Sequence, residues 1–220
     1  MNKFLLSILF SLVASKNIIL VGDSRFVGMA TSLMGFSYST IKNEGGTGTN
    51  VRSTSPRKYS GHSIQVTAQV SAFSYTFSSG SEVYISLHTQ LKTAEPGTIV
   101  LLWLGINDCG AVSSTYSFYA TLALNYPKLN FYSLSITGVN ESKSWIKNSS
   151  VRNFNKELSE RITYSGIYNI QFKSILNGDD PNSIMLDGRI FPISNFLTYD
   201  GLHYMREGYS YLWRAMANIL

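Results

Sequence analysis

A chain of 220 residues is long enough for one domain with a complete hydrophobic core. Its hydrophobic share of 44% and mean hydropathy of +0.02 exclude both an intrinsically disordered chain and a protein built mainly of membrane spans. Only 14% of the residues are charged, against about 25% in an average soluble protein, and the net charge is +5. A charge this small, without a run of Lys and Arg, predicts no nucleic-acid partner.

The first fifteen residues have the three-part pattern of a secretory signal peptide. Lys3 provides the positive start, an apolar stretch follows, and Val13 and Ser15 are small residues suited to a cleavage site. The apolar stretch is too short for a membrane span, which needs about 20 residues. We therefore predict that residues 1–15 are a signal peptide, and that residues 16–220 form a secreted, extracellular domain without stable membrane insertion.

Apolar runs predict five strands, and segments with helical spacing of apolar residues lie between them. The predicted strands are residues 17–21, 36–41, 98–104, 128–133 and 168–173. The sequence TIVLLWL of residues 98–104 is apolar without alternation, which is typical of a central strand buried on both faces. The predicted helices are residues 26–34, 82–93, 151–162 and 206–219, with Ser150 as the N-cap of the third.

The alternation of strands and helices predicts a mostly parallel sheet with helices on both faces. No internal repeat, linker or low-complexity block interrupts the chain, so we expect a single α/β domain. Residues 49–81 carry no clear pattern and stay unassigned.

Cys109 is the only cysteine, which excludes an internal disulfide. Asn140 and Asn148 begin Asn-X-Ser sequons, which are glycosylation sites if the host is eukaryotic.

Polar segments lie at the ends of the predicted strands at four points of the chain. Ser24 follows the first strand in the sequence GDSR, and NEGGTG (residues 43–48) follows the second. GIND (residues 105–108) follows the third strand, and DGLH (residues 200–203) precedes the last helix. Active-site groups of α/β proteins gather at the carboxyl ends of parallel strands. We therefore expect these four segments to meet at one rim of the sheet.

Together the four segments contain the groups that serine hydrolysis requires. The hydroxyl of Ser24 is a weak nucleophile until a base takes its proton, and His203 is a candidate for that base. Asp200, three residues before His203, can hold the imidazole in the required tautomer. The tetrahedral oxyanion also needs hydrogen-bond donors. Candidates are the backbone N–H groups of Ser24 and Gly48 and the side-chain amide of Asn107.

The motifs GDS, NxGxxG, GxND and DxxH, in this order and separation, resemble those of the SGNH (GDSL-type) hydrolase superfamily. The resemblance covers residues 21–209 and implies a flavodoxin-like, three-layer α/β/α fold without a metal or organic cofactor. The resemblance implies that Ser24 is the nucleophile and also an oxyanion donor. It implies that Gly48 and Asn107 are the other oxyanion donors. Asp200 and His203 would then be the two remaining members of the triad.

The sequence departs from the family pattern at one position and is ambiguous at another. Arg25 stands where the family usually has leucine, and a similar GDSR opening occurs in branches that handle acetyl groups on glycans. In the second motif Gly45 and Gly46 compete with Gly48, and the spacing from Asn43 favours Gly48.

Each motif also has a structural interpretation. Ser24 is a suitable helix N-cap, the glycines of NEGGTG fit a flexible turn, and Asn107 and Asp108 fit the turn after a strand. Asp187 is a rival acid for the triad, but its neighbour Gly188 indicates a turn.

Taken together, the four motifs predict a secreted serine esterase that hydrolyses short acyl esters, most simply acetyl esters on a glycan, through an acyl-enzyme. Three alternatives stay open at this point. The acyl group could pass to a sugar hydroxyl, as in a glycan O-acetyltransferase. The enzyme could be a lipase or thioesterase. The domain could also be a secreted binding protein without catalysis.

Overall fold

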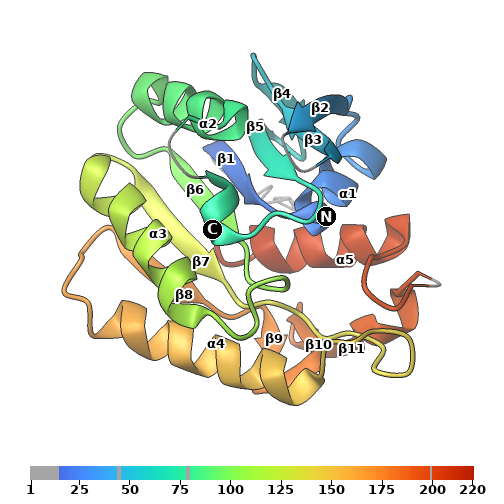
Figure 1. The fold of residues 1–220 in the computed structure, drawn as a ribbon. Helices are drawn as coiled ribbons and strands as arrows, with labels where there is room; N and C mark the ends of the chain where they lie inside the picture. The colour runs from blue at the N-terminus through green and yellow to red at the C-terminus, as the bar shows by residue number, and fades with distance from the viewer. Residues whose placement is uncertain (1–14, 44–45, 78–79, 199) are drawn as a thin grey trace, which may run out of the picture.

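The computed structural model describes residues 15–43, 46–77, 80–198 and 200–220 (Figure 1). Nearly all of the predicted signal peptide, residues 1–15, lies outside the described residues, so secretion stays a prediction. Within the described part of the chain, none of the helices has the length and apolar character that crossing a bilayer requires.

A mostly parallel sheet forms the middle layer, with strand order β2-β3-β5-β1-β6-β7-β8 and with β4 paired to β5. β5, β1, β6, β7 and β8 are parallel to one another, whereas β2, β3 and β4 add antiparallel pairs at one edge. The strands of this sheet are β1 (Asn17–Gly22), β2 (Ser39–Asn43), β3 (Gly46–Arg52), β4 (Arg57–Tyr59), β5 (His62–Gln69), β6 (Ile99–Trp103), β7 (Asn130–Leu134) and β8 (Ile170–Lys173).

Helices cover both faces of this sheet. In Figure 1, α2 and α3 lie on one side, and α1 and α5 lie on the other. The helices are α1 (Ser24–Ser32), α2 (Glu82–Thr93), α3 (Val112–Asn125), α4 (Asn148–Thr163) and α5 (Arg206–Ala217), with the 3-10 turns η1 (Ser74–Phe77) and η2 (Ile193–Phe196). The predicted single domain with a flavodoxin-like, three-layer α/β/α fold is confirmed.

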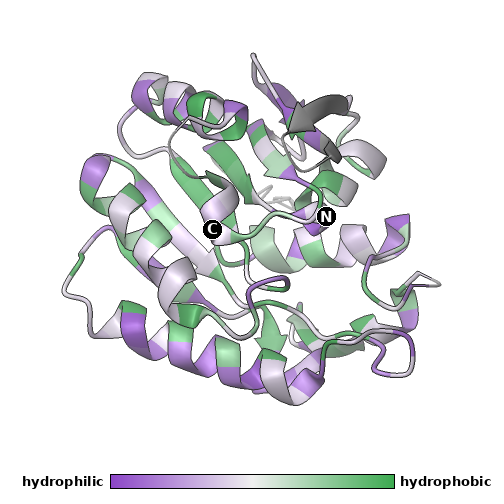
Figure 2. Ribbon diagram, viewed as in Figure 1, coloured by the Kyte–Doolittle hydropathy of each residue, from purple (hydrophilic) through white to green (hydrophobic). Residues whose placement is uncertain are grey.

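The hydrophobic core explains why β1 and β6 are central. All five residues of β6 are buried, as are the last five of β1, and Figure 2 shows the central strands in green. Residues 98–104 were expected to form such a strand, and this expectation is confirmed. The register places Gly22 of β1 level with Ala68 of β5 and Trp103 of β6. The carboxyl ends of these three strands therefore form one rim.

One of the two parallel neighbours of β1 comes from a segment in which no strand was predicted. The second predicted strand, residues 36–41, corresponds to β2, which forms an antiparallel hairpin with β3 at the sheet edge. β1 pairs in parallel with β6 on one side and with β5 on the other, and β5 lies within the unassigned residues 49–81. The second predicted strand therefore lies at the edge of the sheet, and β5 takes the place beside β1.

Several smaller elements also differ from expectation. Helix α3 was not predicted, because its sequence VSSTYSFYATLALN is rich in Ser, Thr and aromatic residues of modest helix propensity. Helix α4 begins at Asn148 rather than Val151, with Lys147 instead of Ser150 as its N-cap. A small second sheet has the order β11-β10-β9 and was not predicted; its strands are β9 (Leu176–Asn177), β10 (Asp180–Leu186) and β11 (Arg189–Pro192).

Candidate active site

Ser24 is the first residue of α1 and follows the carboxyl end of β1 almost directly. Asp23 is the N-cap of this helix, and its side chain accepts the backbone N–H of Arg25 at 2.9 Å. Gly22 is required at the strand end, because a Cβ there would lie 2.7 Å from the carbonyl oxygen of Trp103. The turn from β1 to α1 therefore holds Ser24 at the rim, with 6% of its surface exposed.

Arg25 is a buried cation beside the predicted nucleophile, with only 1% of its surface exposed. Its guanidinium donates two hydrogen bonds of 2.9 Å to Thr137, one to the carbonyl and one to the hydroxyl, and a third of 3.2 Å to the carbonyl of Gly138. The same group lies 5.4 Å from the ring centre of Tyr204 and 6.0 Å from that of Trp103. Arg25 therefore anchors the start of α1 to the segment that follows β7.

The predicted triad members form one continuous chain of hydrogen bonds. His203 Nε2 lies 2.8 Å from Ser24 Oγ, and His203 Nδ1 lies 2.6 Å from Asp200 Oδ2. With its Nδ1–H donated to Asp200, the imidazole has Nε2 left to accept the hydroxyl proton of Ser24. The structure thus brings together three residues that are up to 179 positions apart in the sequence.

Asp200 is held by its own turn. Its Oδ1 accepts the hydroxyl of Thr198 at 2.6 Å and the backbone N–H groups of Leu202 and His203 at 2.9 and 3.0 Å. Burial raises the pKa of Asp200, but these bonds and the one from the His203 side chain outweigh it and hold the pKa well below its ordinary value. Asp200 is therefore a carboxylate that can orient the imidazole and stabilise its protonated form.

The GIND segment follows β6 and reaches across to the segment after β5. Gly105 has φ +129°, and a Cβ there would lie 2.4 Å from the ring of Phe154, so only glycine fits. The amide nitrogen of Asn107 donates to the carbonyl oxygen of Ala72 at 2.9 Å. Because an amide has two N–H groups, Asn107 keeps a second donor for an oxyanion.

Asp108 reinforces the same connection. Its Oδ2 accepts the backbone N–H of Ser74 at 2.9 Å, and burial raises the pKa of this carboxyl. Residues 70–74, which follow β5, are therefore fixed against the GIND segment by two side chains. Sequence reasoning missed this segment because β5 was unassigned, although its run of β-branched residues (HSIQVTAQ) favours a strand.

Gly48 lies inside β3, where it pairs with Ile41 of β2. β3 runs antiparallel to β5, with Asn50 opposite Gln69, so Gly48 lies beyond the carboxyl end of β5. It is therefore in a hairpin on the rim side of the sheet, rather than in a loop after a parallel strand. The motif was expected at the end of a strand of the parallel sheet, and the structure places it in an antiparallel hairpin instead. The role of Gly48 as an oxyanion donor stays a prediction.

Two other titratable groups lie close to the site. Asp23 is 1% exposed, and burial raises its pKa to about 6 although the neighbouring Arg25 lowers it. Burial also raises the pKa of Cys109 to about 11, so this residue is a neutral thiol at pH 7. Asp187, the rival acid, forms the predicted turn with Gly188 between β10 and β11 and pairs with Arg214.

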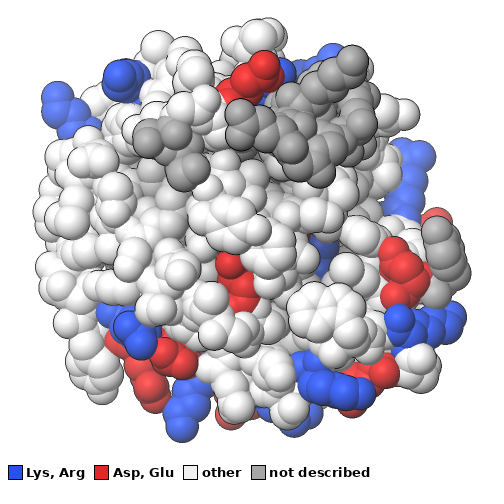
Figure 3. All heavy atoms as spheres, in the orientation of Figure 1, with Lys and Arg blue, Asp and Glu red and all other residues white. Residues whose placement is uncertain are grey.

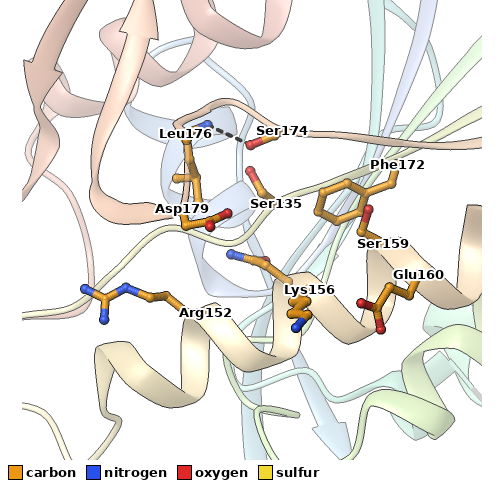
Figure 4. Close-up of a pocket in the computed structure, with 11 residues that line it drawn as sticks. Ser135, Arg152, Lys156, Ser159, Glu160, Phe172, Ser174, Leu176 and Asp179 are labelled. Carbon is orange, nitrogen blue, oxygen red and sulfur yellow. Dashed lines mark hydrogen bonds between the residues drawn. The ribbon is translucent and has the colours of Figure 1, made fainter.

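A cavity of about 710 Å³ lies between α4 and the end of β8, apart from the triad (Figure 4). Arg152 and Lys156 from α4 and Asp179 from the β9–β10 turn border it. The hydroxyls of Ser135 and Ser174 in its wall already accept backbone N–H groups. No triad residue lines this cavity.

One face of the molecule carries few charges. Figure 3 shows a face on which uncharged residues predominate, with Lys, Arg, Asp and Glu mostly near the outline. Among the residues that the structure describes, no group of three or more His, Cys, Asp or Glu is arranged to hold a metal ion.

No protein-family model matches the sequence, and no curated protein sequence matches it. Solved structures do match the fold. A Streptococcus pneumoniae protein described as a platelet activating factor matches with TM-score 0.56 and 19% identity, over 94% of this chain and 85% of that chain. The catalytic domain of the peptidoglycan O-acetyltransferase OatA from the same species matches with TM-score 0.50 and 12% identity, over 93% of this chain and 92% of that chain.

The salicylyl-acyltransferase SsfX3 from a tetracycline biosynthetic pathway has TM-score 0.52 and 11% identity. That match covers 94% of this chain and 56% of the acyltransferase. At identities this low, the three likenesses establish a shared α/β fold.

Proposed function

We propose that this protein is a serine esterase that removes short acyl groups, acetyl in the simplest case, from a glycan outside the cell. The observation that carries the proposal is the hydrogen-bonded chain from Ser24 Oγ through His203 to Asp200. The GDSR motif and the low surface charge support a neutral, hydroxylated substrate. The signal-peptide pattern of residues 1–15 supports the location.

In the first step His203 Nε2 takes the Ser24 proton while Ser24 Oγ attacks the ester carbonyl. The carbonyl oxygen becomes an oxyanion, which accepts hydrogen bonds from the Ser24 N–H and the free N–H of Asn107. A further donor comes from Gly48 or from the backbone of residues 70–74. The tetrahedral intermediate then breaks its bond to the alcohol oxygen, which leaves with the proton from His203.

The second step reverses the roles. His203 removes a proton from water, the resulting hydroxide attacks the acyl-enzyme, and the carboxylic acid leaves as Ser24 recovers its proton. Asp200 stays ionised throughout, since its pKa lies well below the ordinary value. Its charge stabilises the imidazolium that forms in both steps.

The test is hydrolysis of p-nitrophenyl acetate by the purified protein without residues 1–15. Ser24→Ala should lower kcat by at least about 10⁴-fold, since it removes the attacking atom. Ser32→Ala is the matched control, because Ser32 lies on the exposed end of the same helix and should keep full activity. Equal rates in the wild type and Ser24→Ala would refute the esterase, and glycan binding without turnover in both would favour a binding protein.

A related activity uses the same groups with a different acceptor. If a sugar hydroxyl reaches the acyl-enzyme before water, the product is a new sugar ester, as for an O-acetyltransferase. Adding an unacetylated oligosaccharide to the p-nitrophenyl acetate reaction separates the two outcomes. Hydrolysis predicts acetate as the main product, whereas transfer predicts acetylated oligosaccharide formed faster than acetate.

A further inference from the structure

Two aromatic rings are stacked on the segment that borders the predicted oxyanion site. The rings of Phe73 and Tyr75 have centroids 5.0 Å apart and planes within 11° of each other. Tyr75 has 67% of its surface exposed, whereas Phe73 is half-buried. Among the described residues, Tyr75 differs from the other exposed aromatic residues in that its ring is stacked on a second ring, so the pair presents a flat apolar surface.

The segment that carries this pair is fixed at both ends. On one side Asn107 donates to the carbonyl of Ala72, and Asp108 accepts the N–H of Ser74. On the other side Phe77 is 2% exposed and stacks on the partly buried ring of Phe118. The position of the two rings is therefore set by the residues that build the oxyanion site.

The segment that carries the pair follows the strand next to the one that ends at the nucleophile. β5, which precedes the segment, is the direct parallel neighbour of β1, and neighbouring strands are about 4.8 Å apart. Ser24 follows β1 on the same rim. A substrate whose ester reaches Ser24 can therefore extend over residues 73–75.

We propose that Phe73 and Tyr75 form a platform on which a sugar ring of the substrate stacks next to the ester. This inference rests on the function proposed above and deepens it, because it identifies the substrate as a glycan ester through a physical contact. Residues 70–77, VSAFSYTF, carry no charge, which suits a neutral sugar. The exposed ring of Tyr75 offers an apolar face for the C–H groups of a pyranose and a hydroxyl for its polar edge.

An acyl chain is the other ligand that an apolar ring can contact. A long alkyl chain gains affinity by burying its whole circumference, and this needs an enclosed apolar channel. A ring that is two-thirds exposed covers only one side of a ligand. The flat face of a sugar therefore fits the platform better than a chain does.

The experiment compares Tyr75→Ala and Tyr75→Phe on three esters: acetylated xylotetraose, p-nitrophenyl acetate and p-nitrophenyl octanoate. For Tyr75→Ala we expect the ratio of KM for the acetylated xylotetraose to KM for p-nitrophenyl acetate to rise about tenfold. Tyr75→Phe keeps the ring and should stay within about twofold of wild type. Tyr164→Ala is the matched control, since Tyr164 is 85% exposed but lies at the end of α4.

Two results would overturn the platform. One is a ratio in Tyr75→Ala equal to that in Tyr164→Ala. The other is a rise in KM for p-nitrophenyl octanoate without a rise for the sugar ester, which would assign the rings to an acyl chain.

Binding of acetylated xylotetraose to Ser24→Ala, measured by calorimetry with and without Tyr75→Ala, separates this proposal from the proposed function. Weaker binding in the double variant supports the platform even if no form of the protein hydrolyses an ester. Hydrolysis that depends on Ser24, with equal binding in both forms, keeps the esterase and rejects the platform.

Discussion

The two halves of the predicted triad are built in different ways. Ser24 and its neighbours Asp23 and Arg25 are 6%, 1% and 1% exposed, and the core around them fixes their positions. The side chains of His203 and Asp200 are 33% and 35% exposed, and hydrogen bonds within their own turn fix them. Loss of the Ser24 hydroxyl removes the attacking atom. Substitutions of its buried neighbours Asp23 and Arg25 should instead mainly change stability. Those on the histidine side should mainly change turnover.

The largest effect that we expect on the histidine side is that of Asp200→Asn. The amide oxygen can still accept the N–H groups of Leu202 and His203, so the turn should remain folded. The amide cannot stabilise the imidazolium and can hold the wrong tautomer, so kcat on p-nitrophenyl acetate should fall by about 10⁴-fold. Thermal unfolding measured on the same samples should show only a moderate loss of stability, which arises because the fold favours the carboxylate of Asp200.

Asp187→Asn is the control for this substitution. Asp187 is an exposed acid in the β10–β11 turn, and its loss should leave kcat within about twofold of wild type. A large loss of stability in Asp200→Asn, with kcat per folded molecule unchanged, would break the contrast between the two halves.

The next effect concerns Arg25 and is one of stability. Arg25→Leu introduces the residue that the resembled family usually has at this position, but it removes three hydrogen bonds to Thr137 and Gly138. It also leaves the buried carboxylate of Asp23 without its neighbouring cation. Loss of one partner from a buried charged cluster costs about 3–5 kcal/mol, and we expect a decrease of that order in the free energy of unfolding in urea.

Arg214→Leu tests whether the burial of Arg25 causes the destabilisation expected for Arg25→Leu. Arg214 pairs with Asp187 at the surface, where its side chain is 53% exposed, and an exposed pair contributes at most about 1 kcal/mol. Equal destabilisation by the two substitutions would contradict the comparison, because it would mean that the buried setting of Arg25 adds nothing.

The sequence predicted the parts of the fold that depend on local pattern. The fully apolar run of β6 and the regular apolar spacing of α2 are recognisable one segment at a time, and α2 has the predicted bounds. It did not predict which strand pairs with β1, because strand order depends on contacts between distant segments. β2 and β5 are both plausible strands, and only the assembled sheet shows that β5 is the parallel neighbour.

The residues of the candidate site divide in the same way: local motifs indicate some of them, and only contacts between distant segments reveal the others. Ser24, Asp200 and His203 stand in short motifs whose residue types indicate their chemistry. By contrast, the part played by residues 70–74 appears only in hydrogen bonds from Asn107 and Asp108, which no local spacing encodes. The burial of Arg25 was equally invisible, because an arginine after a serine is exposed in most sequence contexts.

The smallest expected effect, on the nucleophile side again, is that of Asp23→Asn. Burial raises the folded-state pKa of Asp23 to about 6 from its ordinary value of 3.8. An acid with a raised pKa gives its full stability below the unfolded pKa, and that stability is lost as the pH rises through the folded pKa. The loss therefore falls between about pH 4 and pH 6 and reaches about 3 kcal/mol at pH 7.

Asparagine at position 23 can keep the N-cap acceptor for the N–H of Arg25 and does not titrate. Relative to wild type, Asp23→Asn should therefore gain up to about 3 kcal/mol in its free energy of unfolding between pH 4 and pH 7. Urea unfolding at one-unit intervals of pH measures this difference. A difference that does not vary with pH would mean that the charge of Asp23 is compensated within the fold. If the gain is found together with a lower kcat, the ionised carboxylate near His203 serves turnover at the expense of stability.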